Sequence, residues 1–269
     1  MLTVTVQNKA GNFIAELHRE AFEIVDDKEA RSIEFFDSSD SPLSIGILVD
    51  NSNSMNEVAR GAIAQALSRF VELSNPQNEY FAIAFDTKPR FLSDWKSGRE
   101  LIAQISNLAP EGRNTAMYDA LLAGIEKLQS AHYPKRAIFI ITDGLDNASH
   151  HTLVQLKEGL RRSDVLFCAF RVATSSIGSR SEREGSDVLT ELAEVAGGTA
   201  LRPYDQQQNE AIELLALQLR HLYRLGFRPN QSVSAGAWHR IRVKVTLGPN
   251  ARQEFRSLTV RTRQGYYRK

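Results

Sequence analysis

The sequence has little of what several classes of protein require. It contains one cysteine in 269 residues, Cys168, so no disulfide can form within the chain and the redox compartment stays undetermined. No stretch approaches the roughly 18 consecutive apolar residues of a membrane-spanning helix. The formal net charge is only +1. It gives no overall basic field, which argues against nucleic acid or an anionic membrane surface as a partner.

The motifs of several enzyme classes are also missing. The sequence has no Gly-x-x-x-x-Gly-Lys loop and no Gly-x-Gly-x-x-Gly after a strand, which argues against nucleotide binding. It has no Gly-x-Ser-x-Gly elbow for a nucleophilic serine. His150 and His151 have no cysteine or third histidine at ligand spacing, so we interpret them as a solvated helix start. Cys168 lies in an apolar run, as a buried and inert thiol would.

What the sequence does contain is typical of a globular protein, with 42% hydrophobic and 24% charged residues. Between residues 43 and 222, apolar runs of strand length alternate with helical patterns, which predicts a Rossmann-like, doubly wound α/β domain with a mostly parallel sheet. The runs at 45–49, 80–85 and 135–141 are continuous rather than alternating, as expected of strands covered on both faces. The segment 173–187, rich in Ser, Arg and Gly, predicts an exposed loop.

The two ends of the chain have a different pattern. Residues 1–37 and 223–269 contain short strands in which apolar and polar residues alternate, and the polar stretch 37–42 marks a boundary. Each segment is too short to form a core alone. We therefore predict that they combine into one small β-sandwich, with the α/β domain 43–222 inserted between them.

The strongest functional signal follows the first buried strand. Asp50, Ser52 and Ser54 stand at every second position after it, where the strand turns toward a helix. In open α/β sheets, ligands bind at this carboxyl end of the strands. A carboxylate and two hydroxyls form an all-oxygen set suited to a hard cation such as Mg²⁺. The alternative is that these side chains only cap the following helix.

Two more polar clusters stand at similar places. Thr115 precedes the helix predicted from residue 116, and Asp143 follows the third buried strand within Thr142-Asp143-Gly144. Taken singly, Thr115 can be a helix cap and Asp143 part of an Asp-Gly turn. Because all three clusters fall where one crevice of an α/β sheet would need them, we predict a divalent metal site.

This combination resembles the von Willebrand factor type A domain with its metal-ion-dependent adhesion site, over residues 43 to about 222. In that family two Ser hydroxyls and a Thr hydroxyl contact the cation, and two Asp carboxylates act directly or through water. The resemblance thus implies a divalent cation, Mg²⁺ first with Mn²⁺ or Ca²⁺ as alternatives. The matching residues are Asp50, Ser52, Ser54, Thr115 and Asp143. Asp146 lies just beyond them, either in contact through water or as a solvated turn residue.

The flanking segments are similar to bacterial proteins called VWFA-related acidobacterial-type. The similarity rests on 3–6, 21–27, 33–36 and the tail 263–267. Members of this group often carry an export signal, whereas Met1 here leads straight into a strand-like alternation. A leader already removed would leave the same pattern, which keeps open a periplasmic, secreted or cytoplasmic location. The insertion of the α/β domain resembles that of the A-type domain in integrin β chains.

The resemblance implies a non-enzymatic, metal-dependent protein-binding module. Its cation would keep an exchangeable water, which an Asp or Glu side chain of a protein partner can replace. The alternative is a metal-assisted hydrolase or phosphoryl-transfer enzyme, which needs a positioned base or cationic side chain. Arg113 is the single basic residue within the motifs, so this alternative is the weaker one. A third possibility is a cation that only stiffens the fold.

Overall fold

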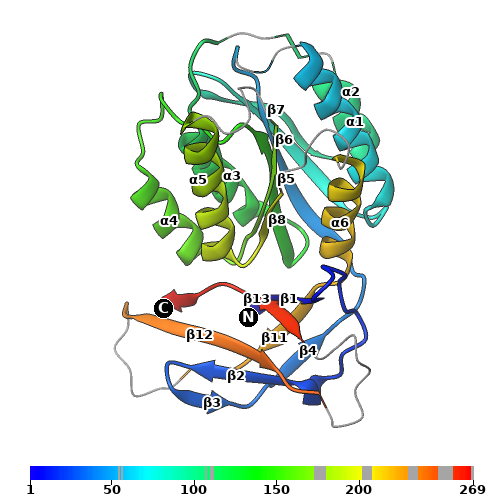
Figure 1. Ribbon diagram of the computed structural model, residues 1–269, viewed down its shortest axis with the longest axis vertical. Coiled ribbons are helices and arrows are strands. Elements are labelled where there is room, and N and C mark those ends of the chain that lie inside the picture. Colours follow the sequence, from blue (N-terminus) through cyan, green and yellow to red (C-terminus); the bar gives the residue numbers. More distant parts are fainter. Residues whose placement is uncertain are drawn as a thin grey trace.

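The computed structural model describes residues 1–53, 55, 57–106, 108–109, 112–172, 180–201, 208–229, 236–247 and 257–267. It contains two parts (Figure 1). One is a six-stranded sheet with helices on both faces, and the other is a pair of four-stranded sheets below it. The α/β fold class predicted from the sequence is confirmed.

The six-stranded sheet is parallel except at one edge. Its strand order is β10-β9-β8-β5-β6-β7, and only β7 runs antiparallel to its neighbour. Every residue of β5 and β9 is buried, which explains why the central strands are continuous apolar runs. The strands are β5 (Leu43–Asp50), β6 (Glu79–Phe85), β7 (Pro89–Lys96), β8 (Lys135–Thr142), β9 (Leu166–Arg171) and β10 (Thr199–Leu201).

Helices cover both faces of this sheet (Figure 1), and in the described part of the chain each face is covered by three of them. Because alternate residues of a strand point to opposite faces, Ile47 packs into one helical layer and Leu48 into the other. One layer consists of α1 (Glu57–Leu73), α2 (Gly98–Ile105) and α6 (Gln208–Arg220). The other consists of α3 (Met117–Lys127), α4 (Leu153–Arg162) and α5 (Arg180–Ala196).

The prediction of a loop over 173–187 is wrong from Arg180 onward, because α5 already begins there. The first two turns of α5 are polar and include an ion pair between Arg180 and Glu184 at 2.7 Å. The apolar period that identifies a helix starts only near Leu189, which hides the earlier turns from a periodicity argument. Residues 173–179 lie outside the described part of the chain.

The strands of the two chain ends interleave in the lower part. β1 pairs with β11 and β13, and β12 pairs with β2, all antiparallel. The sheet orders are β13-β1-β11-β4 and β14-β12-β2-β3, and a third hydrophobic core lies between them. The strands are β1 (Leu2–Asn8), β2 (Phe22–Asp26), β3 (Glu29–Arg31), β4 (Phe35–Asp37), β11 (Tyr223–Gly226), β12 (Trp238–Val245), β13 (Leu258–Arg261) and β14 (Gly265–Tyr267).

The chain leaves this sandwich through β4 and returns through β11, and these two strands are paired, with Arg224 opposite Asp37. The Lys135 ammonium at the start of β8 donates to the Ser39 carbonyl at 2.6 Å. The amino ends of the parallel strands therefore face the sandwich, and their carboxyl ends lie at the far end of the molecule (Figure 1). Within the described residues, no helix is long and apolar enough to cross a membrane.

Candidate functional site

Asp50 closes β5 at the carboxyl edge of the sheet, and its side chain is held on both oxygens. Asp50 is 1% exposed. Its Oδ1 accepts the Ser52 backbone N–H at 3.0 Å, and its Oδ2 accepts the Thr142 hydroxyl at 2.7 Å. The Thr142 oxygen in turn accepts the Gly144 N–H at 3.1 Å. The ends of β5 and β8 are therefore joined through one carboxylate.

The electrostatics of this carboxylate are unusual. Burial raises the pKa of Asp50 to about 6, and the nearby charge of Asp143 adds to the rise. Hydrogen bonds from Ser52 and Thr142 favour the charged form and oppose the shift. Two buried carboxyl groups at one end of a sheet form a strongly negative site that a bound cation would neutralise.

Thr115 belongs to a loop that contacts both of the other clusters. Its backbone N–H donates to the Asn147 side chain at 2.8 Å, and its carbonyl accepts the Asn147 N–H at 2.9 Å. On the other side, Gly112 forms a parallel bridge with Ser52. This loop thus lies between the segments that follow β5 and β8, and Thr115 is 5% exposed at their junction.

Asp143 and Gly144 lie against the first half of α5. The Asp143 carboxylate accepts the Leu145 N–H at 3.1 Å. Gly144 has a φ of +89°, which favours glycine, and a Cβ there would lie 2.4 Å from the Gly185 carbonyl oxygen. A Cβ on Gly185 would lie 2.4 Å from the Asp143 carbonyl oxygen. The two glycines let helix and loop approach closely and so fix where Asp143 stands.

The structure brings Asp50, Ser52, Thr115 and Asp143 to one edge of the sheet, each at most 5% exposed. Ser54 lies outside the described residues. Thr115 does not cap α3, because the N-cap position is Ala116. The Asp146 side chain accepts the Tyr118 N–H at 3.0 Å and the Ser149 hydroxyl at 2.6 Å, so it organises the loop instead of pointing freely into solvent.

Two residues of the site were not assigned roles from the sequence. Thr142 bonds Asp50, and Asn147 fixes the backbone of Thr115. Both stand inside the polar stretch that follows the third buried strand, which was the available signal. Their roles depend on which loops meet in space, and no spacing within one segment reveals that.

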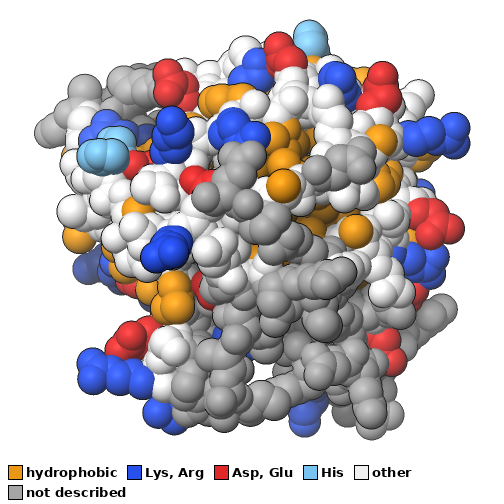
Figure 2. Space-filling model, turned by 90° about the horizontal axis from the view of Figure 1, so that it is seen from above, with side chains coloured by type: hydrophobic (Ala, Val, Ile, Leu, Met, Phe, Trp, Pro, Cys, Tyr) orange, Lys and Arg blue, Asp and Glu red, His pale blue; other side chains and the backbone are white. Residues whose placement is uncertain are grey.

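Figure 2 views the molecule from this end. Acidic and basic side chains are spread around the margin, and neither sign forms a continuous field. The exposed residues near the site include Asn53, Arg113 and Asn114. Among the described residues, this face therefore shows no large charged patch that would select a ligand by net charge.

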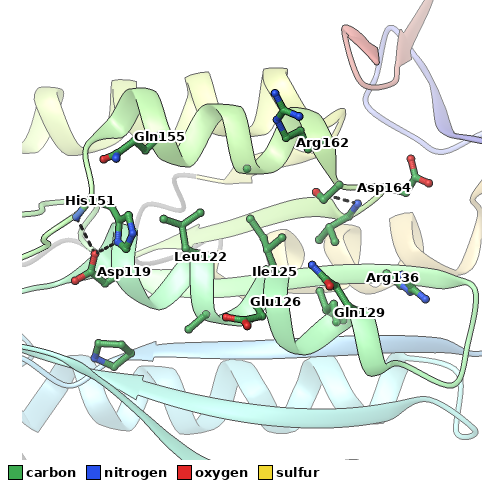
Figure 3. Close-up of a pocket in the computed structure, with 16 residues that line it drawn as sticks. Asp119, Leu122, Ile125, Glu126, Gln129, Arg136, His151, Gln155, Arg162 and Asp164 are labelled. Carbon is green, nitrogen blue, oxygen red and sulfur yellow. Dashed lines mark hydrogen bonds and ion pairs between the residues drawn. The ribbon is translucent and has the colours of Figure 1, made fainter. Parts of the chain in front are cut away.

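A hollow of about 980 Å³, apart from the site around Asp50, lies between α3 and α4 (Figure 3). Its floor is formed by Leu122 and Ile125, and Asp119 stands at one end. The Asp119 carboxylate accepts the backbone N–H groups of His150 and His151, each at 3.0 Å, and contacts both imidazoles. The two histidines are thus fixed to α3, where the sequence suggested only a solvated helix start.

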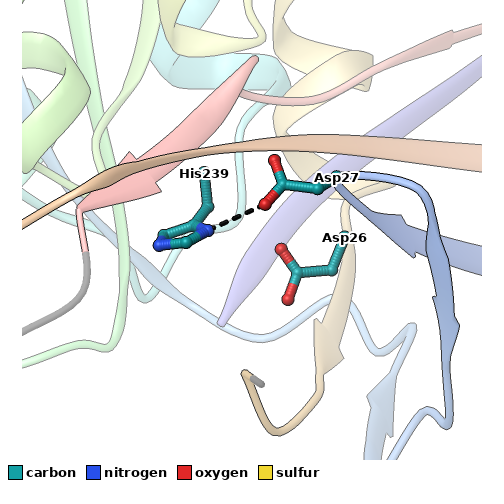
Figure 4. Close-up of side chains that lie close together, drawn as sticks. All are labelled: Asp26, Asp27 and His239. Carbon is teal, nitrogen blue, oxygen red and sulfur yellow. Dashed lines mark hydrogen bonds and ion pairs between the residues drawn. The ribbon is translucent and has the colours of Figure 1, made fainter. Parts of the chain in front are cut away.

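Among the described residues, one group of three His, Cys, Asp or Glu side chains has ligand atoms within 4.8 Å of one another: Asp26, Asp27 and His239 in the sandwich (Figure 4). His239 Nδ1 contacts Asp27 at 2.9 Å, and Asp26 accepts the Tyr266 hydroxyl at 3.1 Å. Arg31 also contacts Asp26 at 3.5 Å. These partners compensate both carboxylates, so the group secures the β2–β3 turn against β12.

The comparisons with known proteins agree with the fold. Residues 45–145 match the family model of the von Willebrand factor type A domain. No curated protein matches the sequence. A von Willebrand factor type A protein from Catenulispora acidiphila is 13% identical with a TM-score of 0.57, over 93% of this chain and 62% of that one. An aerotolerance-related membrane protein from Bacteroides fragilis is 18% identical with a TM-score of 0.54, over 66% of this chain and 98% of that one.

The PilB minor pilin from Streptococcus sanguinis is 14% identical with a TM-score of 0.53, over 67% of this chain and 61% of that one. Identities this low establish the fold alone. The family match and the doubly wound sheet together define the α/β part as a von Willebrand factor type A domain. The resemblance noted in the sequence is confirmed at this level.

Proposed function

We propose that this chain is a non-enzymatic protein-binding module that uses a divalent cation to capture an acidic side chain of a protein partner. The observation that carries the proposal is the buried Asp50, joined to Thr142 and lying beside Asp143 at the carboxyl edge of the sheet. An open α/β sheet binds its ligands at this edge.

The side chains present fit such a cation. Asp50, Ser52, Thr115 and Asp143, with Ser54 from the same motif, would hold it through oxygen atoms alone, the donor type that Mg²⁺ and Mn²⁺ prefer. A cation held largely by neutral hydroxyls stays electrophilic and accepts a further carboxylate. Capture of a carboxylate by such a cation needs no chemical step.

The first test measures cation binding and capture together. Immobilised chain should retain a set of proteins from an extract of the source organism in millimolar Mg²⁺, release them in EDTA, and fail to retain them after their carboxyl groups have been amidated. Thr115→Ala removes one hydroxyl and should weaken retention about tenfold with little loss of stability, whereas Thr259→Ala, an exposed threonine on β13, should behave as the unmodified chain.

Retention that is indifferent to EDTA would contradict the proposal. The hydrolase alternative predicts a different result. The unmodified chain should then cleave a phosphate or carboxylate ester in the presence of Mg²⁺, and Asp50→Ala should not. If the chain binds the cation but neither retains a protein partner nor cleaves an ester, the cation would serve only to stabilise the fold.

A further inference from the structure

A groove of about 750 Å³ runs between the base of the type A domain and the sandwich. It is bounded by the end of α5, by β12 and by the segment from β13 toward β14. Asp50 is the last residue of β5, and the carboxyl ends of the parallel strands lie at the opposite end of the domain from this groove (Figure 1). Five of the lining side chains are cationic and one is acidic: Arg161, Arg240, Arg242, Lys244 and Arg261 against Glu194.

This charge is concentrated, because the whole chain has a net charge of only +1. Lys244 has a partner, Glu23, at 3.5 Å. Arg240 and Arg242 take part in no ion pair with a described residue. The Nε atoms of Arg161 and Arg261 are buried and lack a hydrogen-bond partner in the described structure. Buried donors without an acceptor are costly, so they favour a ligand that supplies anionic oxygens.

The backbone of β12 adds a second feature to this groove. β14 pairs with Trp238–Arg240 only, whereas β2 pairs with the strand from Ile241 to Val245. The Ile241 N–H points away from β2, since it donates to the Gln264 carbonyl at 3.0 Å. Because backbone groups alternate in direction along a strand, those of Val243 also face the groove. Among the residues that the structure describes, no strand pairs with this half of β12 on that side, so it is a strand edge on which an extended segment can add.

The side chains of β12 indicate which residue types such a segment should contain. Arg240, Arg242 and Lys244 are exposed on one face, and Ile241 and Val243 are buried on the other. Neighbouring cations are two residues apart, which is about 6.6 Å along a strand. An added strand places alternate side chains beside Arg242 and Lys244 and the intervening ones over the apolar face.

We propose that this groove binds an extended peptide segment of a partner protein in which acidic residues alternate with apolar ones, added as a strand to the free half of β12. The site shares no residue with the metal site and does not depend on the function proposed for it. Stacking of a nucleic acid base is disfavoured, because the Trp238 ring already contacts Arg161 at 5.5 Å and Tyr267 at 5.0 Å.

The experiment uses the full chain in EDTA and a fluorescein-labelled Glu-Val-Glu-Val-Glu peptide, read by fluorescence polarisation. The peptide should bind saturably, and Lys-Val-Lys-Val-Lys should not. Arg242→Ala should weaken binding roughly two- to fivefold, the effect of one cross-strand charge pair. Arg99→Ala, an exposed arginine on α2, is the matched control and should change nothing. Asp50→Ala should bind as the unmodified chain does.

Backbone methylation of the peptide tests the strand addition itself. In an added strand, only alternate N–H groups face β12. Methylation of the valine nitrogens and methylation of the glutamate nitrogens should therefore differ, with one peptide binding normally and the other at least tenfold more weakly. Equal affinities would overturn strand addition. Tighter binding of tripolyphosphate or a thymidine oligonucleotide than of the peptide, at the same ionic strength, would overturn the assigned ligand.

Discussion

At Asp50, burial and charge act against each other. The side chain is 1% exposed and lies near a second carboxyl group, Asp143. Burial raises its pKa to about 6, so above that pH the folded protein carries a buried negative charge that the unfolded chain would leave in water. A cation bound at this place would remove the conflict, and its binding would thereby be linked to folding.

We predict that Mg²⁺ or Mn²⁺ raises the free energy of unfolding near neutral pH. A ligand that binds the folded state alone contributes about 2.7 kcal/mol at a hundredfold excess over Kd. Asp50→Ala should remain folded, because it removes the charge that faces Asp143, and should lose this gain. Thermal denaturation with EDTA and with millimolar Mg²⁺ measures both. Asp94→Ala, an exposed carboxylate on β7, should keep the gain. Identical melting temperatures with and without cation would disprove the linkage.

Among the elements, the loop after β8 is fixed to α3 by Asp119. Burial alone would raise the pKa of Asp119, but hydrogen bonds from the backbone and rings of His150 and His151 hold it well below its usual range. A lowered pKa means that the charged carboxylate stabilises the folded state above the unfolded pKa of about 3.9, and that this stability is lost as the pH falls further.

Asp119→Asn should therefore reduce the free energy of unfolding by about 1–3 kcal/mol near neutral pH, since it weakens charge-assisted hydrogen bonds. The difference from the unmodified chain should shrink as the pH falls below about 4. Urea denaturation over a pH series measures it. Asp94→Asn alters an exposed pair with Lys127 and should have little effect on the free energy of unfolding. A loss of stability that is the same at every pH would contradict this account.

The contact between α5 and the loop after β8 provides the next prediction. Gly185→Ala places a Cβ 2.4 Å from the Asp143 carbonyl oxygen, whereas Gly61→Ala in α1 meets nothing within 4 Å. Both changes gain helix propensity, about 0.5–1 kcal/mol, so their difference isolates the contact. We expect Gly61→Ala to stabilise the chain and Gly185→Ala to cost about 1–3 kcal/mol.

Gly185→Ala should also weaken cation binding, because Asp143 must move. Calorimetric titration with Mn²⁺ reads this directly, with Gly61→Ala as the matched control. If both variants bound the cation equally, the close approach of α5 would not be what positions Asp143.

The elements differ in how far the sequence reveals them. β5 and β8 are apparent because strands covered on both faces are continuous apolar runs. β7 is not recognisable from the sequence, since it is an antiparallel edge strand with a mixed burial pattern. Asp50 and Ser52 were identifiable because a strand ends there. Asn147 was not, because its contact with Thr115 spans 32 residues and depends on how two loops meet.

At the scale of the whole molecule, the α/β domain is inserted between paired strands. Asp37 at the end of β4 is the partner of Arg224 in β11, so the two crossing points are neighbours. The sandwich has its own hydrophobic core, separate from the two cores of the α/β sheet.

We predict that replacing residues 38–222 with a turn of about four residues leaves a folded, all-β protein, because such a turn closes neighbouring antiparallel strands. Circular dichroism should show strands without helices, and Mg²⁺ should have no effect on melting. The melting temperature should fall below that of the full chain, since the pairs of Arg263 with Asp164 at 2.5 Å and of Tyr267 with Glu158 at 2.8 Å are lost.

The excised segment 38–222 should keep its response to Mg²⁺. If the sandwich without residues 38–222 does not fold, its stability depends on the inserted domain. If the excised segment 38–222 does not fold, the stability of the inserted domain depends on the sandwich.

The paired crossing points also determine how the molecule carries tension. A pull applied at the carboxyl edge of the six-stranded sheet would reach the sandwich through β4 and β11 at once, because these two strands are paired where the chain crosses between the two parts. The pull acts along the strands, and antiparallel ladder bonds lie across them. All the bonds that join β11 to β1 then share the load in shear, instead of opening one after another as in a zipper. In this geometry the resistance of the sandwich to such a pull would depend on the length of the β1–β11 ladder.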